Sequence, residues 1–109
     1  MKKTSWLLTL LFAVSIINYP NPFNPKGGEV ATFECSAEAS TSAVMYIYDA
    51  AARLMARKDW ALTAGTTSRT TWNGYNNQQD IVGNGIYLYQ VLDAARNRLG
   101  KGKIWVINR

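Results

Sequence analysis

Apolar and polar residues alternate in short runs along most of the chain, and this pattern predicts β-strands. Residues 31–35 show it most clearly, because Ala31, Phe33 and Cys35 are separated by polar residues and so give one apolar face and one wet face. Comparable runs, rich in β-branched and aromatic residues, occupy positions 43–48, 66–72, 86–92 and 103–107. Turn signals that contain glycine lie at 26–28, 64–65, 73–74, 83–85 and 100–102. Short strands at this spacing favour an antiparallel β-sandwich of about seven strands.

Residues 50–60 are the segment whose composition competes with this pattern. Its alanines, together with Leu54 and Met55, favour a short helix that Asp49 would cap. The surrounding strands favour instead a tight turn at 49–52 and an outgoing strand from Arg53, because a lone short helix finds no groove to fill. We therefore expect a hairpin here. The residues expected to point into the sandwich are Phe33, Met45, Ile47, Trp72, Tyr87, Tyr89 and Val106.

The first fifteen residues predict an apolar leader helix that acts as a signal peptide. Lys2 and Lys3 precede an apolar run at 6–17, and the small residues Ala13 and Ser15 suit a signal peptidase. The run would span about 18 Å as a helix, which is too short for a hydrocarbon core of roughly 30 Å. Cleavage after Ser15 is therefore favoured over an uncleaved anchor, and it leaves one small domain.

Charge and cysteine content narrow the choice of partners. The sequence has 12 Lys and Arg against 7 Asp and Glu, and the basic residues are scattered, so nucleic-acid binding has little support. The basic stretch at 96–103 could contact an anionic polysaccharide or lipid headgroups, although a solvated hairpin is the simpler interpretation. A single cysteine excludes an internal disulfide. Its place in the apolar alternation indicates that Cys35 is a buried small hydrophobe rather than a reactive thiol.

The sequence contains few of the residue arrangements that catalysis requires. The sequence has no histidine, its acidic residues are dispersed, and no glycine-rich loop introduces a helix. Asp49 and Asp80 lie outside any dense acidic loop of the kind that binds calcium, so turn-capping hydrogen bonds are the better account of both. We therefore expect no enzymatic activity, no cofactor, no metal site and no small-molecule substrate.

All three prolines of the chain fall within residues 19–25, Tyr-Pro-Asn-Pro-Phe-Asn-Pro. Each proline fixes its own φ at about −65° and pushes the preceding residue toward extended conformations. We expect residues 16–25 to form an extended lead-in to a domain at 26–109. Within residues 19–25, Tyr19 and Phe23 are the only large apolar side chains that can press onto a core.

This lead-in and five later motifs resemble a known family: the C-terminal Ig-like domains similar to the flagellar hook-capping Ig-like domain, which serve as type IX secretion sorting domains. The later motifs are 47–53, 62–65, 72–74 and a glycine-tyrosine strand at 83–89 before a basic last strand at 103–107, all in the family's order. The residues that carry the resemblance are Tyr19, Pro20, Asn21, Pro22, Phe23, Asn24, Pro25, Asp49, Arg53, Gly65, Trp72, Asn73, Gly74, Gly85, Tyr87 and Lys103. Trp72, Tyr87 and Tyr89 are most simply core residues rather than ligand contacts. Ala52 stands where the family has glycine, so it would be strained if the turn needs a positive φ.

The resemblance implies an all-β, Ig-like antiparallel β-sandwich that is noncatalytic and recognised by the outer-membrane secretion machinery. The protein would pass through the periplasm and be secreted or held at the cell surface. Family members normally follow a long cargo domain, whereas here the domain follows the leader directly. For sorting, we expect the last strand, 103–107, to offer unpaired backbone groups at a sheet edge.

Two alternatives stay open. The protein could be an extracellular structural or interaction module that self-associates through a strand edge or binds a surface glycan. It could also be the remnant of a larger secreted protein.

Overall fold

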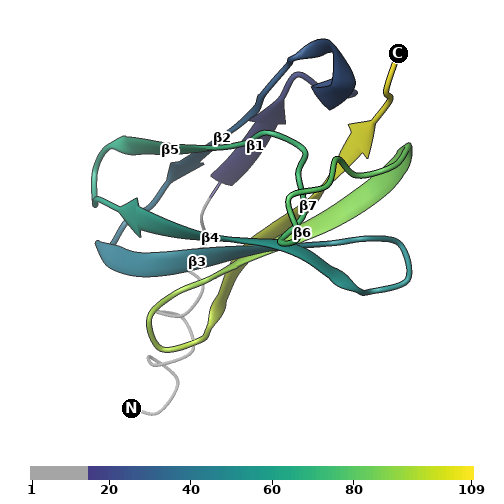
Figure 1. Ribbon diagram of the computed structural model, residues 1–109. Coiled ribbons are helices and arrows are strands. Elements are labelled where there is room, and N and C mark those ends of the chain that lie inside the picture. Colours follow the sequence, from purple (N-terminus) through teal and green to yellow (C-terminus); the bar gives the residue numbers. More distant parts are fainter. Residues whose placement is uncertain (1–14) are drawn as a thin grey trace, which may run out of the picture.

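A computed structural model describes residues 15–109. Within them the chain forms seven strands and one short 3₁₀-helix (Figure 1). The elements are β1 (Ser15–Tyr19), η1 (Pro25–Gly27), β2 (Ala31–Ser36), β3 (Thr41–Tyr48), β4 (Leu54–Leu62), β5 (Thr67–Trp72), β6 (Gly85–Leu92) and β7 (Arg98–Val106). The expected leader helix and signal peptide lie, apart from Ser15, outside the described residues.

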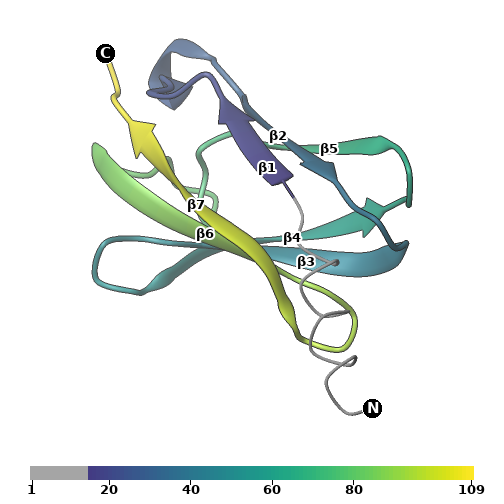
Figure 2. The ribbon, with the colours of Figure 1, turned by 180° about the vertical axis from the view of Figure 1, so that it is seen from behind.

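The strands form two antiparallel sheets that face each other. The smaller sheet has the order β1-β2-β5, and the larger has the order β4-β3-β6-β7. Figures 1 and 2 show the two sheets as separate layers, with β1 and β7 near each other along one side. The expected all-β architecture, with seven strands in two antiparallel sheets, is confirmed.

The core fills the space between the sheets. All seven residues expected to point inward are buried, with at most 7% of their surface exposed. Cys35 is also fully buried, and this burial raises the pKa of its thiol. Apolar side chains that alternate along each strand therefore meet in one cluster, which is the outcome that a period of two residues predicts.

Residues 54–62 form a strand, so the hairpin expected after Asp49 is confirmed and the competing helix is wrong. β4 pairs with β3 from Thr41 opposite Leu62 to Ile47 opposite Ala56. This register buries Ala56, Trp60 and Leu62. The helix propensity of the alanines amounts to a few tenths of a kcal/mol per residue, and the burial and pairing gained by a strand exceed it.

The last strand begins earlier than expected. β7 starts at Arg98, and the glycines that predicted a turn at 100–102 instead pair with Val91 and Tyr89. Gly102 lies where a Cβ atom would come within 2.4 Å of the Tyr89 hydroxyl. The glycine is needed because the Tyr89 ring fills the space that its side chain would occupy, so it marks close packing and not a turn.

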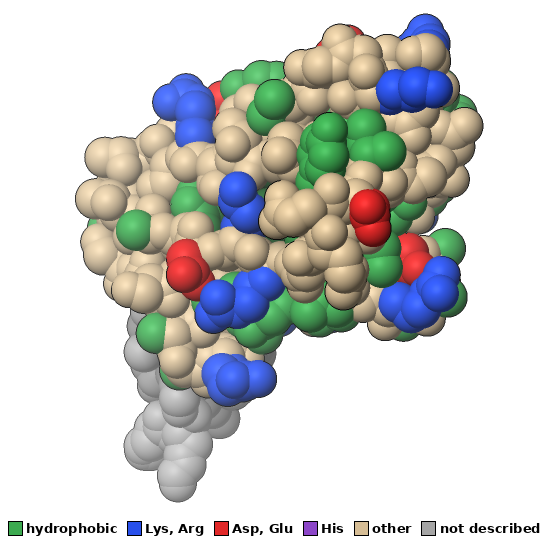
Figure 3. Space-filling view, in the orientation of Figure 1, with side chains coloured by type: hydrophobic (Ala, Val, Ile, Leu, Met, Phe, Trp, Pro, Cys, Tyr) green, Lys and Arg blue, Asp and Glu red, His purple; other side chains and the backbone are tan. Residues whose placement is uncertain are grey.

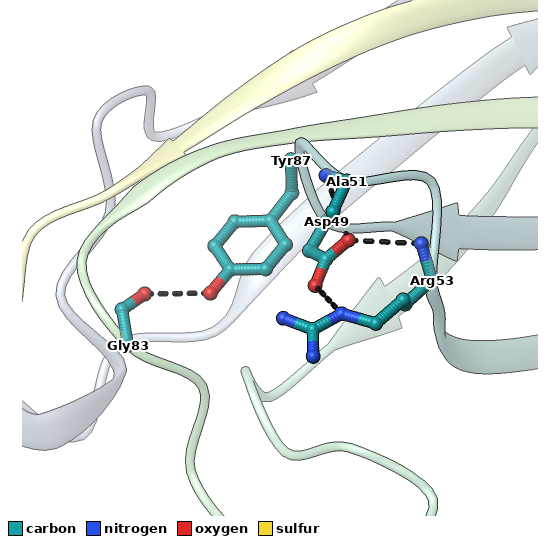
Figure 4. A network of polar contacts seen from close by, with 5 residues as sticks. All are labelled: Asp49, Ala51, Arg53, Gly83 and Tyr87. Carbon is teal, nitrogen blue, oxygen red and sulfur yellow. Dashed lines mark hydrogen bonds and ion pairs between the residues drawn. The ribbon is translucent and has the colours of Figure 1, made fainter.

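One five-residue turn occurs three times, at 49–53, 76–80 and 93–97. Its first residue is Asp or Asn, whose Oδ1 accepts hydrogen bonds of 2.8–3.0 Å from the amides of the third and fifth residues. Figure 4 shows the first copy, in which Asp49 accepts from Ala51 and Arg53. The fourth residue has a positive φ in each copy: Ala52 at 65°, Gln79 at 69° and Arg96 at 70°.

Asp49 and Asp80, which were both expected to cap turns, occupy different positions in these turns. Asp49 caps the first turn, as expected. The expectation for Asp80 is wrong, because Asp80 is the fifth residue of its turn and its amide donates to Asn76 Oδ1 at 3.0 Å. The capping side chain therefore belongs to Asn76, which is the first residue of that turn.

We expect Ala52→Gly to stabilise the protein. A left-handed conformation costs an L-residue roughly 1–2 kcal/mol, and glycine removes that cost while making the unfolded chain more flexible by about 0.4–1 kcal/mol. The net gain should be about 0.5–1 kcal/mol, seen as a rise of a few degrees in the melting temperature. Ala51→Gly is the matched control: Ala51 has no positive φ, so this change should destabilise. An unchanged or lower melting temperature for Ala52→Gly would contradict the expected strain.

Candidate functional site

The proline-rich lead-in is built into the sandwich. β1 pairs with β2 from Ser15 opposite Ser36 to Tyr19 opposite Thr32, and the chain then passes to the side of β7. The lead-in was expected to be extended to residue 25, but Pro25 is the first residue of η1. Asn24 accounts for the difference: its side chain accepts a hydrogen bond of 3.0 Å from the Gly27 amide and so caps the short helix.

The two aromatic residues of the lead-in have opposite environments. Phe23 is 1% exposed and lies against Trp72, with ring centroids 5.6 Å apart. Tyr19 is 43% exposed, so the expectation that it packs onto the core is wrong. The reason is register: alternate residues of β1 face opposite sides, and Asn18 takes the inner side, where its Oδ1 accepts from the Tyr89 hydroxyl at 2.8 Å.

Tyr19 instead joins a polar cluster on the outer face of the smaller sheet. Its hydroxyl donates to Glu34 Oε2 at 2.5 Å, and Arg69 Nε donates to the same oxygen at 2.9 Å. These two hydrogen bonds, the one from Tyr19 first, lower the pKa of Glu34, and the bond to Glu34 raises the pKa of Tyr19. The cluster links β1, β2 and β5 across the surface.

The lead-in covers the outer edge of β7. The Phe23 amide donates to the Trp105 carbonyl at 2.8 Å, and the Ile107 amide donates to the Phe23 carbonyl at 3.0 Å. The Trp105 amide donates to Asn21 Oδ1 at 2.8 Å, so an amide side chain takes the place of a strand backbone. The Lys103 carbonyl also accepts hydrogen bonds, from the side-chain amides of Asn18 and Asn21.

This arrangement corrects the expectation of a free edge at 103–107. The outward-facing backbone groups of Trp105 and the amide of Ile107 are occupied by the lead-in. Strand addition at this position would first require the lead-in to leave. We call the paired segments, residues 18–25 and 103–109, the lead-in clasp.

Trp72, Gly74 and Tyr87 support the clasp from inside. The Trp72 ring lies 5.9 Å from the Tyr87 ring, and its Nε1 donates to the Tyr75 carbonyl at 2.9 Å. Gly74 has a φ of 84°, and a Cβ atom there would lie 2.4 Å from Pro25 Cβ. Asn73 Oδ1 accepts from the Tyr75 amide at 3.0 Å. The motif at 72–74 thus makes room for the proline of the lead-in.

Asparagine side chains extend the clasp near the C-terminus, and two of them, Asn84 and Asn108, were not predicted as site residues. Asn108 Oδ1 accepts from the Lys26 amide at 3.2 Å, and its Nδ2 donates to the Val82 carbonyl at 2.9 Å. Asn84 Oδ1 accepts from the Asn108 amide at 2.7 Å, and Asn24 Oδ1 accepts from the Arg109 amide at 3.2 Å. Only the high number of asparagines in these loops could have indicated such a network.

Asp49 and Arg53 form an ion pair near the Tyr87 side chain (Figure 4), and we call these three residues the brace. Asp49 Oδ2 lies 2.8 Å from Arg53 Nε, and the Tyr87 hydroxyl donates to the Gly83 carbonyl at 2.7 Å. The hydrogen bond from the Arg53 amide is the main cause that lowers the pKa of Asp49. Burial, followed by the charge of Asp49, raises the pKa of Tyr87. Both groups therefore keep their usual charge at neutral pH, which suits a structural role.

The structure brings most of the family-motif residues together at one end of the sandwich. Gly85 begins β6 next to the brace, with a φ of 149°. Gly65 lies apart from them: it has a φ of 76°, and its amide donates to the Ala37 carbonyl at 3.2 Å. Pro20 and Pro22 lie within the clasp itself, and each follows a cis peptide bond.

One face of the molecule shows how its basic side chains are distributed. On the face shown in Figure 3, the Lys and Arg side chains lie at separate points rather than in one patch. Residues 15–109 contain no group of three or more His, Cys, Asp or Glu side chains placed to hold a metal ion. In the same part of the chain, no helix is long and apolar enough to cross a membrane.

Comparison with known proteins finds similarity in structure. No protein-family model and no curated protein matches the sequence. The fold is similar to part of latent PorU from Porphyromonas gingivalis, with a TM-score of 0.74 and 23% identity over 88% of this chain and 9% of PorU. It is also similar to part of PorZ, a surface component of the type IX secretion system of the same bacterium, with a TM-score of 0.62 and 22% identity over 86% of this chain and 12% of PorZ.

FlgD from P. aeruginosa has a similar fold as well, with a TM-score of 0.62 and 14% identity over 86% of this chain and 74% of that one. Because all three proteins are less than 25% identical to this chain, the likeness shows a shared fold. The chain spans only a small part of the length of PorU and PorZ.

Proposed function

We propose that this chain is a noncatalytic Ig-like module that directs secretion and surface attachment through the type IX pathway. The observation that carries the proposal is the lead-in clasp, which joins the proline motif and the last strand by hydrogen bonds into one continuous surface. The fold shared with part of PorZ supports it, because PorZ belongs to that secretion system. The strand order in the two sheets is also compatible with an Ig-like sandwich.

The residues of the family motif support a noncatalytic role. The carboxylate of Asp49 holds a turn, the hydroxyl of Tyr87 bonds a backbone carbonyl, and the ring of Trp72 is buried. Each of these groups is thus already engaged in holding the fold. The proposed partner is the outer-membrane secretion machinery, and the surface offered to it is the exposed side of the clasp, where Lys103 and Trp105 face solvent.

A fusion experiment tests this function. Placed after a periplasmic reporter in a host with type IX machinery, residues 16–109 should carry the reporter to the cell surface or the medium, whereas the unfused reporter stays in the periplasm. Lys103→Gln should reduce the exported fraction, because it removes an exposed charge from the clasp and leaves the backbone bonds in place. Lys26→Gln removes a charge from η1 and is the matched control.

The result depends on the fusion being folded, which protease resistance of the domain can show. A folded fusion that remains entirely in the periplasm would refute the sorting function. Equal export of the Lys103→Gln and Lys26→Gln variants would place recognition elsewhere on the domain.

Self-association through a strand edge has less support. β4 is the other outer strand of the larger sheet, and its Lys58 lies on the inner side together with Ala56 and Trp60. An inward-pointing charge on an edge strand discourages pairing with another chain, because pairing would trap the charge beside the core. We therefore favour the secretion function over an assembly through the edge of β4.

A further inference from the structure

The outer face of the larger sheet carries three parallel rows of side chains. Tyr46 and Tyr48 of β3 form the first row, Gln90 and Leu88 of β6 lie opposite them, and Lys101 and Lys103 of β7 lie opposite these in turn. Alternate residues of one strand lie about 6.6 Å apart, and neighbouring strands lie about 4.8 Å apart. We call these six residues the tyrosine–lysine face.

This face is hollowed and partly apolar. A groove of about 540 Å³ is lined by Tyr48, Leu88, Gln90 and the two lysines, among others. The Tyr46 and Tyr48 rings lie 6.4 Å apart, with planes inclined by only 25°. Leu88 is 40% exposed. The two tyrosines are half-buried, so the groove offers partly exposed aromatic and aliphatic surface next to the lysines.

The charges along the groove are uncompensated. The ion pairs found within residues 15–109 join Asp49 to Arg53, Asp59 to Arg57 and Glu34 to Arg69. Lys101 and Lys103 are in none of them and stand side by side on the rim. Two ammonium groups beside an apolar strip complement a ligand that combines negative charge with an apolar surface.

We propose that the tyrosine–lysine face binds an acidic polysaccharide whose sugar units carry carboxylates. The C–H face of a pyranose ring is apolar and packs against Tyr48 and Leu88, which removes both surfaces from water. The carboxylates of a chain that runs along the strands reach Lys101 and Lys103. Gln90 Nε2 and the Tyr48 hydroxyl lie 3.5 Å apart, at the limit of a hydrogen bond, so both can bond to sugar hydroxyls.

The position of the face favours a sugar chain over a peptide. β3 and β6 are interior strands of the sheet, with neighbours on both sides, so the groove floor offers side chains and no free backbone groups. An extended peptide laid there would have to leave its own amides without backbone partners. The hydroxyls of a sugar chain on the open side of the groove keep their water. The proposal goes beyond the secretion function and does not depend on it.

Affinity electrophoresis of the purified protein tests the proposal, with polygalacturonate as the acidic probe. Polygalacturonate should retard the protein, whereas neutral dextran, polyglutamate and single-stranded DNA should bind at least about tenfold more weakly. Tyr48→Ala should weaken binding of polygalacturonate by about tenfold or more, because it removes the apolar platform. The double variant Lys101→Gln/Lys103→Gln should weaken it similarly and reduce its dependence on salt.

Matched variants outside the face provide the controls. Tyr75→Ala removes another exposed tyrosine, and Lys26→Gln/Arg96→Gln removes two other exposed charges; both should bind within about twofold of the original protein. Thermal melting verifies that every variant is folded. Equal or stronger binding of polyglutamate or DNA, or an equal loss in the control variants, would overturn the proposal, as would the absence of any binding to polygalacturonate.

Discussion

Replacing Trp72 with alanine should lower the free energy of unfolding by about 3–5 kcal/mol, which is enough to unfold much of a domain this small. The ring is 2% exposed and touches aromatic rings from two other segments, Phe23 of the lead-in and Tyr87 of β6. Removing the ring leaves a cavity between the Phe23 and Tyr87 rings. The substitution also removes the hydrogen bond that Trp72 Nε1 donates to the Tyr75 carbonyl. Chemical denaturation followed by circular dichroism measures the loss.

Trp105→Ala is the matched control for this experiment. Trp105 is 47% exposed on the outer face of β7, and the substitution leaves its backbone hydrogen bonds to the lead-in intact. We expect a loss of less than about 1 kcal/mol. If both substitutions had the same effect, Trp72 would not be the centre of the core that its contacts indicate.

Phe23→Ala should be nearly as damaging, with a loss of about 3–5 kcal/mol. Phe23 is 1% exposed, in agreement with its expected place against the core. Its ring anchors the lead-in, so truncation should also loosen the backbone bonds of Phe23 to Trp105 and Ile107. Hydrogen exchange at the Ile107 amide should accelerate together with the drop in stability.

Tyr19→Ala tests whether this effect is specific to the buried ring. Tyr19 belongs to the same motif but is exposed, and it contributes a surface hydrogen bond to Glu34. Its loss should be small, within about 1 kcal/mol. A melting temperature for Phe23→Ala close to that of the unchanged protein would show that the lead-in does not hold the sandwich together.

The strands and the inward residues could be predicted because they follow a local rule. A period of two residues assigns each side chain to one face, and Phe33, Met45 and Ile47 all obey it. The hairpin after Asp49 could be preferred over a helix for another reason: strands surround it, and a lone short helix would have no groove to fill. Its strained residue, Ala52, stood out because alanine occupies a turn position suited to glycine.

The clasp could not be predicted, because it depends on contacts between distant segments. The chain leaves one sheet and reaches the other between Tyr19 and Phe23, so the alternation that would assign their faces breaks there. Asn21 replaces a backbone partner of Trp105 at 2.8 Å across 84 positions of sequence. Gly102 could not be predicted for the same reason. The sequence alone does not distinguish a glycine that makes room for a ring from another strand from a glycine that forms a turn.

The parallel bridge between Phe23 and Val106 also determines how the domain would respond to tension. The lead-in and β7 run in the same direction, so a pull on the preceding chain and an opposite pull on the C-terminus would slide the two segments past each other. The bonds of Phe23 to Trp105 and Ile107 would then be loaded together in shear instead of opening one after another. A module tethered at one end and dragged at the other would thus carry the load at the pairing of β1 with β2, through which the pull enters, and at the contact of its proline motif with β7.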